Sequence, residues 1–183
     1  MKLYEQYPTE ITWKQNKYKL NLSFKAVLLV IDIFDDSQLS SQDKCELALN
    51  VFIKGEYPLD YFLLEAIFNL IKPVNEKSGE KVIDFEKDAF FLISGFRQAY
   101  GIDLVREDLH YLEFVALLNG LPEDTKIMEI IRIRTMEIPL MTEQNKKYVQ
   151  ELLELKAKYS LKKEENFNEG LAKLFDRLKG EAK

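Results

Sequence analysis

Residues 84–134 read DFEKDAFFLISGFRQAYGIDLVREDLHYLEFVALLNGLPEDTKIMEIIRIR, the stretch that decides the fold expected for this chain. Apolar side chains recur in it at helical spacing. Gly101 and Gly120 stand where helices should end, because glycine readily adopts the left-handed backbone of a helix C-terminus. Three consecutive helices are therefore expected: one capped by Asp84, one over about residues 106–119, and one that starts at Pro122 with Asp124 in its first turn.

Arg134 ends the apolar face of the third of these helices. A guanidinium at such a place should either extend to the solvent or pair with a carboxylate. The candidate partners are Asp84, Asp88 and Asp103.

Residues 10–22 predict a β-hairpin ahead of the helices. A two-residue turn at Gln15 and Asn16 suits this stretch, because asparagine tolerates positive φ. Since alternate residues of a strand share a face, and an isolated hairpin is marginally stable, one apolar face must pack on helices. The side chains on that face are Ile11, Trp13, Tyr18 and Leu20.

Three helices are expected to follow the hairpin and to end near residues 34, 54 and 71. Ser23 and Ser41 are the expected N-caps of the first two, and Pro58 sits in the first turn of the third. The polar segment 73–81 then links these helices to the central stretch.

Pro139 breaks the helical pattern, and two amphipathic segments follow it. Thr142 is the expected cap of a helix that ends near residue 159. We expect residues 1–139 to form the hairpin and the helical core. We expect residues 140–183 to form a C-terminal amphipathic helical segment, either a flap on the same domain or an association surface.

The composition favours the same architecture. The chain has 183 residues, of which 46 % are apolar, and it contains only 7 Gly and 5 Pro. Such a balance is globular and helical rather than rich in turns. The expected fold is mainly α, a single helical domain of about six to eight helices with a small N-terminal β-hairpin.

The charge balance and the single cysteine limit the functions to consider. A net charge of −5 disfavours a general attraction to nucleic acid or to anionic membranes. Cys45 is the only cysteine, so no intramolecular disulfide can form, which suits a reducing cytoplasm. The N-terminus lacks the apolar core of a signal peptide, and we expect a cytoplasmic protein.

No catalytic or cofactor-binding constellation is evident in the sequence. One His and one Cys are too few for a usual metal site, and no glycine-rich phosphate loop occurs. We therefore expect a protein that is not an enzyme, without cofactor or metal, in which His110 is structural. The enzyme alternative would pair His110 with Glu113 or Glu107.

A second alternative is a small helical nucleic-acid-binding or regulatory protein. It would draw a helix-turn-helix from the two helices around Gly120. Glu123 and Asp124 disfavour this reading, because they would present carboxylates to phosphate.

Apolar side chains outside the core-facing stripes mark candidate partner-binding surfaces. Phe90 and Phe91 lie outside the core-facing apolar stripe of their helix. Their position fits either a partner-binding edge or a central helix that is packed on two sides. The final segment adds an apolar stripe of its own. The candidate partner-binding residues are Phe90, Phe91, Leu117, Leu171, Leu174, Phe175 and Leu178.

The central stretch resembles the phage and prophage "gene product fifteen" family of Gram-positive bacteria. The order of its motifs carries the resemblance, which covers roughly residues 4–160. One departure occurs, since Tyr111 and Leu112 stand where the family has tryptophan after the histidine. The motifs are Asp84-Phe85-Glu86 with Asp88, Phe96, Tyr100-Gly101-Ile102-Asp103-Leu104, Leu109-His110, Phe114, Ala116-Leu117-Leu118, Gly120 to Lys126, Ile130 and Arg134.

The resemblance implies a part in tail morphogenesis. Members are encoded between the major tail protein and the tape-measure protein of long-tailed phages, which is the position of tail assembly chaperones. The implied partners are the tape-measure protein and the major tail protein, which forms the tail tube, and self-association is a further expectation. The implied location is the bacterial host cytoplasm, with no place in the mature virion.

Overall fold

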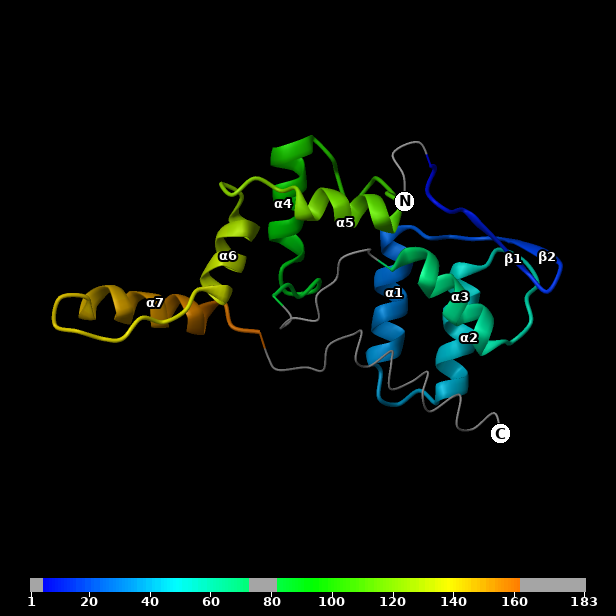
Figure 1. Ribbon diagram of the computed structural model, residues 1–183, viewed down its shortest axis with the longest axis horizontal. Coiled ribbons are helices and arrows are strands. Elements are labelled where there is room, and N and C mark those ends of the chain that lie inside the picture. Colours follow the sequence, from blue (N-terminus) through cyan, green and yellow to red (C-terminus); the bar gives the residue numbers. More distant parts are fainter. Residues whose placement is uncertain (1–4, 73–81, 162–183) are drawn as a thin grey trace. The chain divides into compact units, whose positions relative to one another are not determined.

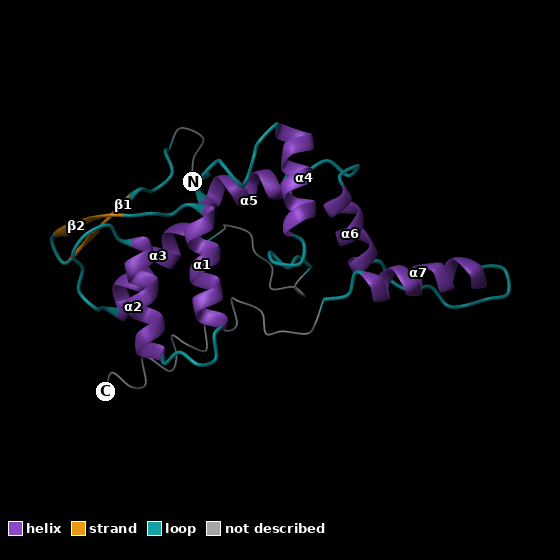
Figure 2. Cartoon of the chain, turned by 180° about the vertical axis from the view of Figure 1, so that it is seen from behind, coloured by secondary structure: helices purple, strands orange, loops and turns teal. Residues whose placement is uncertain are grey.

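The computed structural model describes residues 5–72 and 82–161, and within them it is mainly α with one N-terminal hairpin (Figures 1 and 2). The predicted fold class is thus confirmed, with seven helices in the described residues. The final amphipathic segment of the prediction lies outside them. The elements are β1 (Glu10–Trp13), β2 (Asn16–Lys19), α1 (Phe24–Asp35), α2 (Ser41–Phe52), α3 (Tyr61–Ile71), α4 (Ala89–Tyr100), α5 (Tyr111–Asn119), α6 (Lys126–Thr135) and α7 (Lys146–Lys158).

The described residues divide into two compact units. Unit 1 holds residues 5–72 and Asp108–Ala116, and unit 2 holds residues 82–107 and 117–161. The predicted boundary after residue 139 stays a prediction. Pro139 itself lies within unit 2, between α6 and α7.

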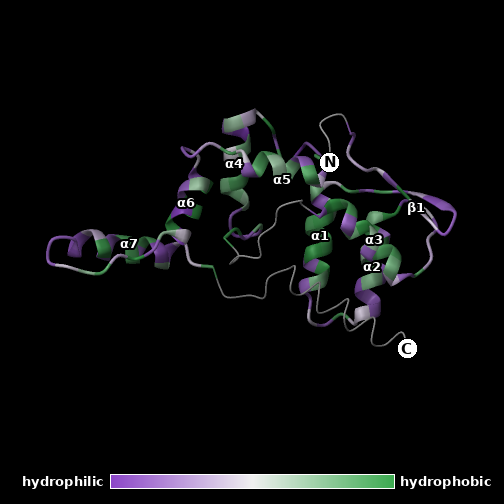
Figure 3. Ribbon diagram, in the orientation of Figure 1, coloured by the Kyte–Doolittle hydropathy of each residue, from purple (hydrophilic) through white to green (hydrophobic). Residues whose placement is uncertain are grey.

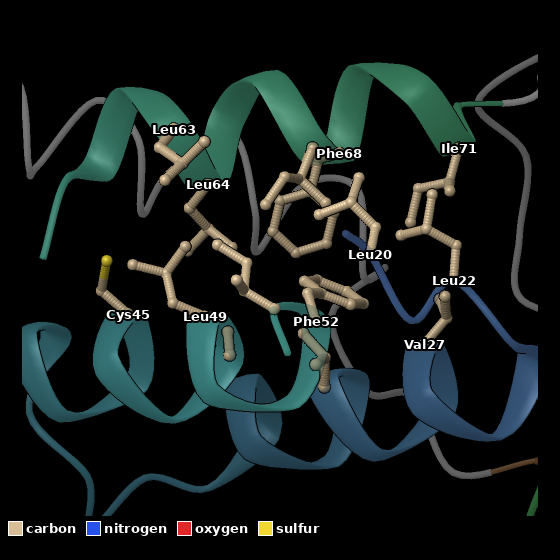
Figure 4. Packing of buried hydrophobic residues seen from close by; sticks show 14 residues of the cluster. Leu20, Leu22, Val27, Cys45, Leu49, Phe52, Leu63, Leu64, Phe68 and Ile71 are labelled. Carbon is tan, nitrogen blue, oxygen red and sulfur yellow. The ribbon is translucent and has the colours of Figure 1, made fainter. Parts of the chain in front are cut away.

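The core of unit 1 is formed by α1, α2 and α3 together with Leu20 and Leu22 (Figure 4), and the apolar face of the hairpin packs against it. Phe52 is fully buried at its centre, and the ring of Phe68 meets both Phe52 and Phe34 edge-on, at centroid distances of 5.6 and 5.7 Å. Such edge-to-face pairs add to the stability gained from burying the rings.

The hairpin has the predicted apolar face but a different turn. Its turn residues are Lys14 and Gln15, both with positive φ, and Ile11 pairs with Tyr18. The predicted turn at Gln15 and Asn16 was therefore wrong. The observed register differs by two residues, so the same side chains still face the core, because side-chain direction alternates with a period of two. An additional constraint acts on the turn, since the Trp13 indole and the Lys14 ammonium both donate to the Asp60 carboxylate, at 3.0 and 2.8 Å.

Helix starts were predicted less well than helix ends. Ser23 caps α1 as expected, whereas α2 is capped by Ser40, which forms a capping box with Asp43. Asp60, not the region of Pro58, starts α3, because its carboxylate accepts from two amides of the first turn.

The central helices start later than predicted as well. Asp84 accepts from the amides of Glu86 and Lys87 and so caps a turn that precedes α4. The start of α5 moves from residue 106 to Tyr111 for a tertiary reason. The backbone on either side of His110 pairs with residues 22–24 of unit 1, which holds it extended. Likewise α6 and α7 start at Lys126 and Lys146, three or four residues after the predicted positions.

In unit 2, α6 packs closely on α4. Gly95 of α4 lies where a Cβ atom would come within 3.2 Å of the Ile127 side chain of α6. Phe96, Ile127 and Ile130 are fully buried in this contact region. A residue without a side chain at position 95 therefore allows the two helices to approach.

Candidate interaction surface of the second unit

An ion pair between Arg134 and Asp88 organises unit 2. The guanidinium donates to both carboxylate oxygens, at 2.6 and 2.8 Å, and the two side chains are 10 % and 2 % exposed. Of the three predicted partners, the structure thus selects Asp88. A bidentate pair of this kind is both strong and geometrically specific.

The remaining donors of Arg134 bind backbone carbonyls from distant segments. Its Nε atom donates to the carbonyl of Tyr159 at 2.7 Å, and Nη1 donates to the carbonyl of Val82 at 2.8 Å. Lys156 in turn donates to the carbonyl of Arg134 at 2.8 Å. These contacts join the first described residues of unit 2 to the ends of α6 and α7, and so fix the position of α7.

Phe90 is the most exposed of the predicted partner-binding residues that the structure describes. Its side chain is 84 % exposed on the first turn of α4. Ser94 and Arg97 continue the same exposed face one and two turns further along. Phe90 is thus a single aromatic side chain on an otherwise polar helix face.

The other candidate residues do not extend the exposed surface of Phe90. Phe91 and Leu117 are each half-buried. The Leu117 carbonyl accepts from the Tyr100 hydroxyl at 2.9 Å, at the opposite end of α4 from Phe90. Ten helical residues rise by roughly 15 Å, so Phe90 and Leu117 do not share one patch. Leu171, Leu174, Phe175 and Leu178 lie outside the described residues.

A second exposed apolar surface, which the sequence reasoning missed, lies on the connection between α6 and α7. Leu140 is 90 % exposed, and Ile138, Met141 and Tyr148 are each about half exposed. We call these four residues the connection surface. Figure 3 shows hydrophobic residues both on α7 and on the loop that runs beside it. The sequence does contain a signal for this surface, namely the run of apolar residues around Pro139. Pro139 was interpreted there only as a helix break.

His110 has a structural role in unit 1. Its Nε2 atom donates to the carbonyl of Pro8 at 3.1 Å, while Nδ1 accepts from the amide of Leu112 at 3.1 Å and so caps α5. The ring stacks on Tyr7 at 4.7 Å. Burial lowers the pKa of His110, against the raising effects of the bond to Pro8 and of the Glu113 charge. Both ring nitrogens are thus engaged by the backbone rather than by Glu113 or Glu107.

The lone cysteine is buried in the core of unit 1. Desolvation, with smaller contributions from the charges of Asp60 and Glu46, raises the pKa of the Cys45 thiol to about 12. A thiol with so high a pKa supplies almost no thiolate near neutral pH, and thiolate is the reactive form. Among the described residues, no three His, Cys, Asp or Glu side chains are grouped so that they could hold a metal ion.

The fold of the described residues defines a mainly α protein with a small N-terminal hairpin. The chain belongs to the Bacteriophage Gp15 protein family, whose family model matches residues 3–161. This match confirms the resemblance drawn from the motif order of residues 84–134. Comparisons with curated proteins and with solved structures find no match. Over residues 5–72 and 82–161, no helix is both long and apolar enough to cross a membrane.

Proposed function

We propose that this protein is a tail assembly chaperone that binds the tape-measure protein and the tail-tube protein of a long-tailed phage. The observation that carries the proposal is membership of the phage family over residues 3–161. The resemblance of the central stretch implies a gene position between those two partners, where tail assembly chaperones are encoded. On this proposal the protein acts in the host cytoplasm and is absent from the finished virion.

A physical argument supports binding to a tape-measure protein. Such a protein is a long helical chain with apolar surface, which aggregates when it is not covered. An acidic helical protein that displays single apolar anchors can cover it by helix-in-groove contacts. Many copies bound along a repetitive chain gain avidity, so that a weak individual contact is sufficient.

Phe90 is the residue best placed to anchor this contact. A solvent-exposed phenyl ring at the start of α4 contributes nothing to the core of unit 2, and its apolar area becomes favourable only when a partner covers it. Aromatic side chains are also those enriched at the energetic centres of interfaces. Phe91, the half-buried neighbour of Phe90 in the sequence, would contribute at the margin, whereas Leu117 at the other end of α4 would lie outside this contact.

Co-expression with the tape-measure protein of the same phage tests the proposal. We expect the tape-measure protein to become soluble and to copurify with this chain. The proposal fails if the tape-measure protein stays insoluble and if affinity purification captures neither it nor the tail-tube protein.

A pair of matched variants tests the role of Phe90. Phe90→Gln removes the apolar anchor, and Ser94→Gln changes an exposed position one turn away on the same face. We expect Phe90→Gln to reduce the recovered tape-measure protein at least tenfold while Ser94→Gln leaves recovery unchanged. Equal recovery with both variants would remove Phe90 from the interface.

A further inference from the structure

The connection between α6 and α7 has a defined conformation although its apolar side chains are exposed. The Asn145 side-chain amide donates to the carbonyl of Leu140 at 2.9 Å, and its oxygen accepts from the amide of Thr142 at 2.6 Å. The Tyr148 hydroxyl approaches the Met136 sulfur at 3.5 Å, so the connection folds back beside the first turn of α7. The exposed residues therefore lie on a turn whose conformation is fixed by hydrogen bonds of the Asn145 side chain.

The four residues of the connection surface lie close together in the sequence. Ile138, Leu140, Met141 and Tyr148 lie within eleven consecutive residues. None of the four contributes to the buried core of unit 2. A cluster of exposed large apolar side chains of this kind is typical of a site that another molecule covers.

The charged residues next to the connection surface are of both signs. Glu137 and Glu143 flank it on the connection, and Lys146 and Lys147 flank it at the start of α7. All four are exposed, and the pair from Lys147 to Glu151 is long, at 3.9 Å, between side chains that are 92 % and 61 % exposed. Such a pair contributes little, so Lys147 remains available to a second molecule.

The mixture of signs favours a second copy of this chain as the occupant. An anionic membrane would require a basic rim, and a strongly charged protein partner would require a rim of the opposite sign. A rim with two carboxylates and two ammonium groups is complementary to itself. When two copies meet about a two-fold axis, each surface patch contacts the same patch of its partner, so a carboxylate of one copy can pair with an ammonium group of the other.

We propose that the connection surface is a self-association site through which two copies of this chain form a dimer. The apolar side chains of 138–148 pack across the two-fold axis. Glu143 of each copy pairs with Lys147 of the other, at the N-terminal end of α7 where the helix dipole also favours a carboxylate. Four side chains from each copy make a small interface, so the dimer is weak and depends on concentration. This dimer is independent of tape-measure binding through Phe90.

Sedimentation equilibrium of the full chain over a hundredfold range of concentration tests the dimer. The wild-type protein should shift from the mass of one chain towards twice that mass. Leu140→Gln should abolish the shift. The control Leu153→Gln replaces an exposed leucine of α7 that lies outside the connection surface, and it should leave the shift unchanged. A wild-type chain that remains monomeric throughout overturns the proposal, as does a shift that Leu140→Gln leaves intact.

A charge exchange tests the two-fold geometry itself. Glu143→Lys and Lys147→Glu should each be monomeric, because each places like charges across the axis at both contacts. An equimolar mixture of the two variants should dimerise again, because every facing pair is then of opposite sign. A mixture that stays monomeric, while the wild type dimerises, would overturn this pairing. If Leu140→Gln instead loses the tape-measure protein and the wild type is a monomer, the occupant is that partner and not a second copy.

Discussion

The pair between Arg134 and Asp88 offers the sharpest test of how unit 2 is stabilised. Replacing Arg134 with Met keeps the length and apolar stem of the side chain but removes the guanidinium. The carboxylate of Asp88, which is 2 % exposed, then keeps only the amide of Asp84, at 2.9 Å, as a donor. The carbonyls of Val82 and Tyr159 lose their donor in the same step.

The expected magnitude follows from this burial. Removing one partner of a buried ion pair costs about 3–5 kcal/mol, because an uncompensated charge remains. For a chain of this size, each kcal/mol lowers the melting temperature by about 2–4 °C, so Arg134→Met should lower it by roughly 6–20 °C. The free energy of unfolding is measured by urea denaturation followed by far-UV circular dichroism, and hydrogen exchange should place the loss of protection in residues 82–107 and 117–161.

The matched control is Arg132→Met. Arg132 lies in the same last turn of α6, but its side chain is exposed. An exposed substitution of this kind changes stability by less than about 0.5 kcal/mol. Adding Asp88→Asn to Arg134→Met removes the orphaned charge and keeps an acceptor for the Asp84 amide. The double variant should therefore be less destabilised than the sum of the two single variants. Equal stability of Arg134→Met and Arg132→Met would refute the reasoning.

Three further predictions concern His110, Cys45 and Gly95. Because burial lowers the pKa of His110 from 6.5, the unfolded chain binds the proton more readily. Stability should thus be complete above pH 6.5 and fall below it, and His110→Asn, which keeps a cap acceptor for the Leu112 amide, should flatten this dependence in urea titrations. Cys45 should react with a thiol reagent at neutral pH only as fast as the protein unfolds, and rapid labelling of the native chain would contradict its burial. Gly95→Val should cost about 1–3 kcal/mol by crowding Ile127, and an unchanged urea midpoint would contradict the close contact of α4 and α6.

Local chemistry was sufficient to predict most of the helices. Ser23 accepts from the amide of Ala26 as an N-cap should, and Gly101 ends α4 with a φ of 71°. These features depend on residues three or four positions apart, so the sequence carries them directly. The apolar face of the hairpin was predictable for the same reason, since it survives a register shift of two residues.

The start of α5 was not predictable in this way. Residues from Arg106 onwards have helical propensity, yet the amides of Phe24 and Tyr111 donate to the carbonyls of Leu109 and Leu22. A pairing between segments more than 80 positions apart overrides a weak local preference. It also places His110 against Pro8, a contact that no spacing in the sequence indicates.

The sequence by itself determined the mainly α class, the apolar stripes and the motif order that identifies the phage family, because these depend on periodicity and composition. Only the tertiary structure decided which carboxylate pairs with Arg134 and which apolar side chains remain exposed. Burial depends on what the rest of the chain covers. Phe90 and Leu140 are as apolar as any core residue, and they become candidate interaction sites because no other described part of unit 2 packs over them.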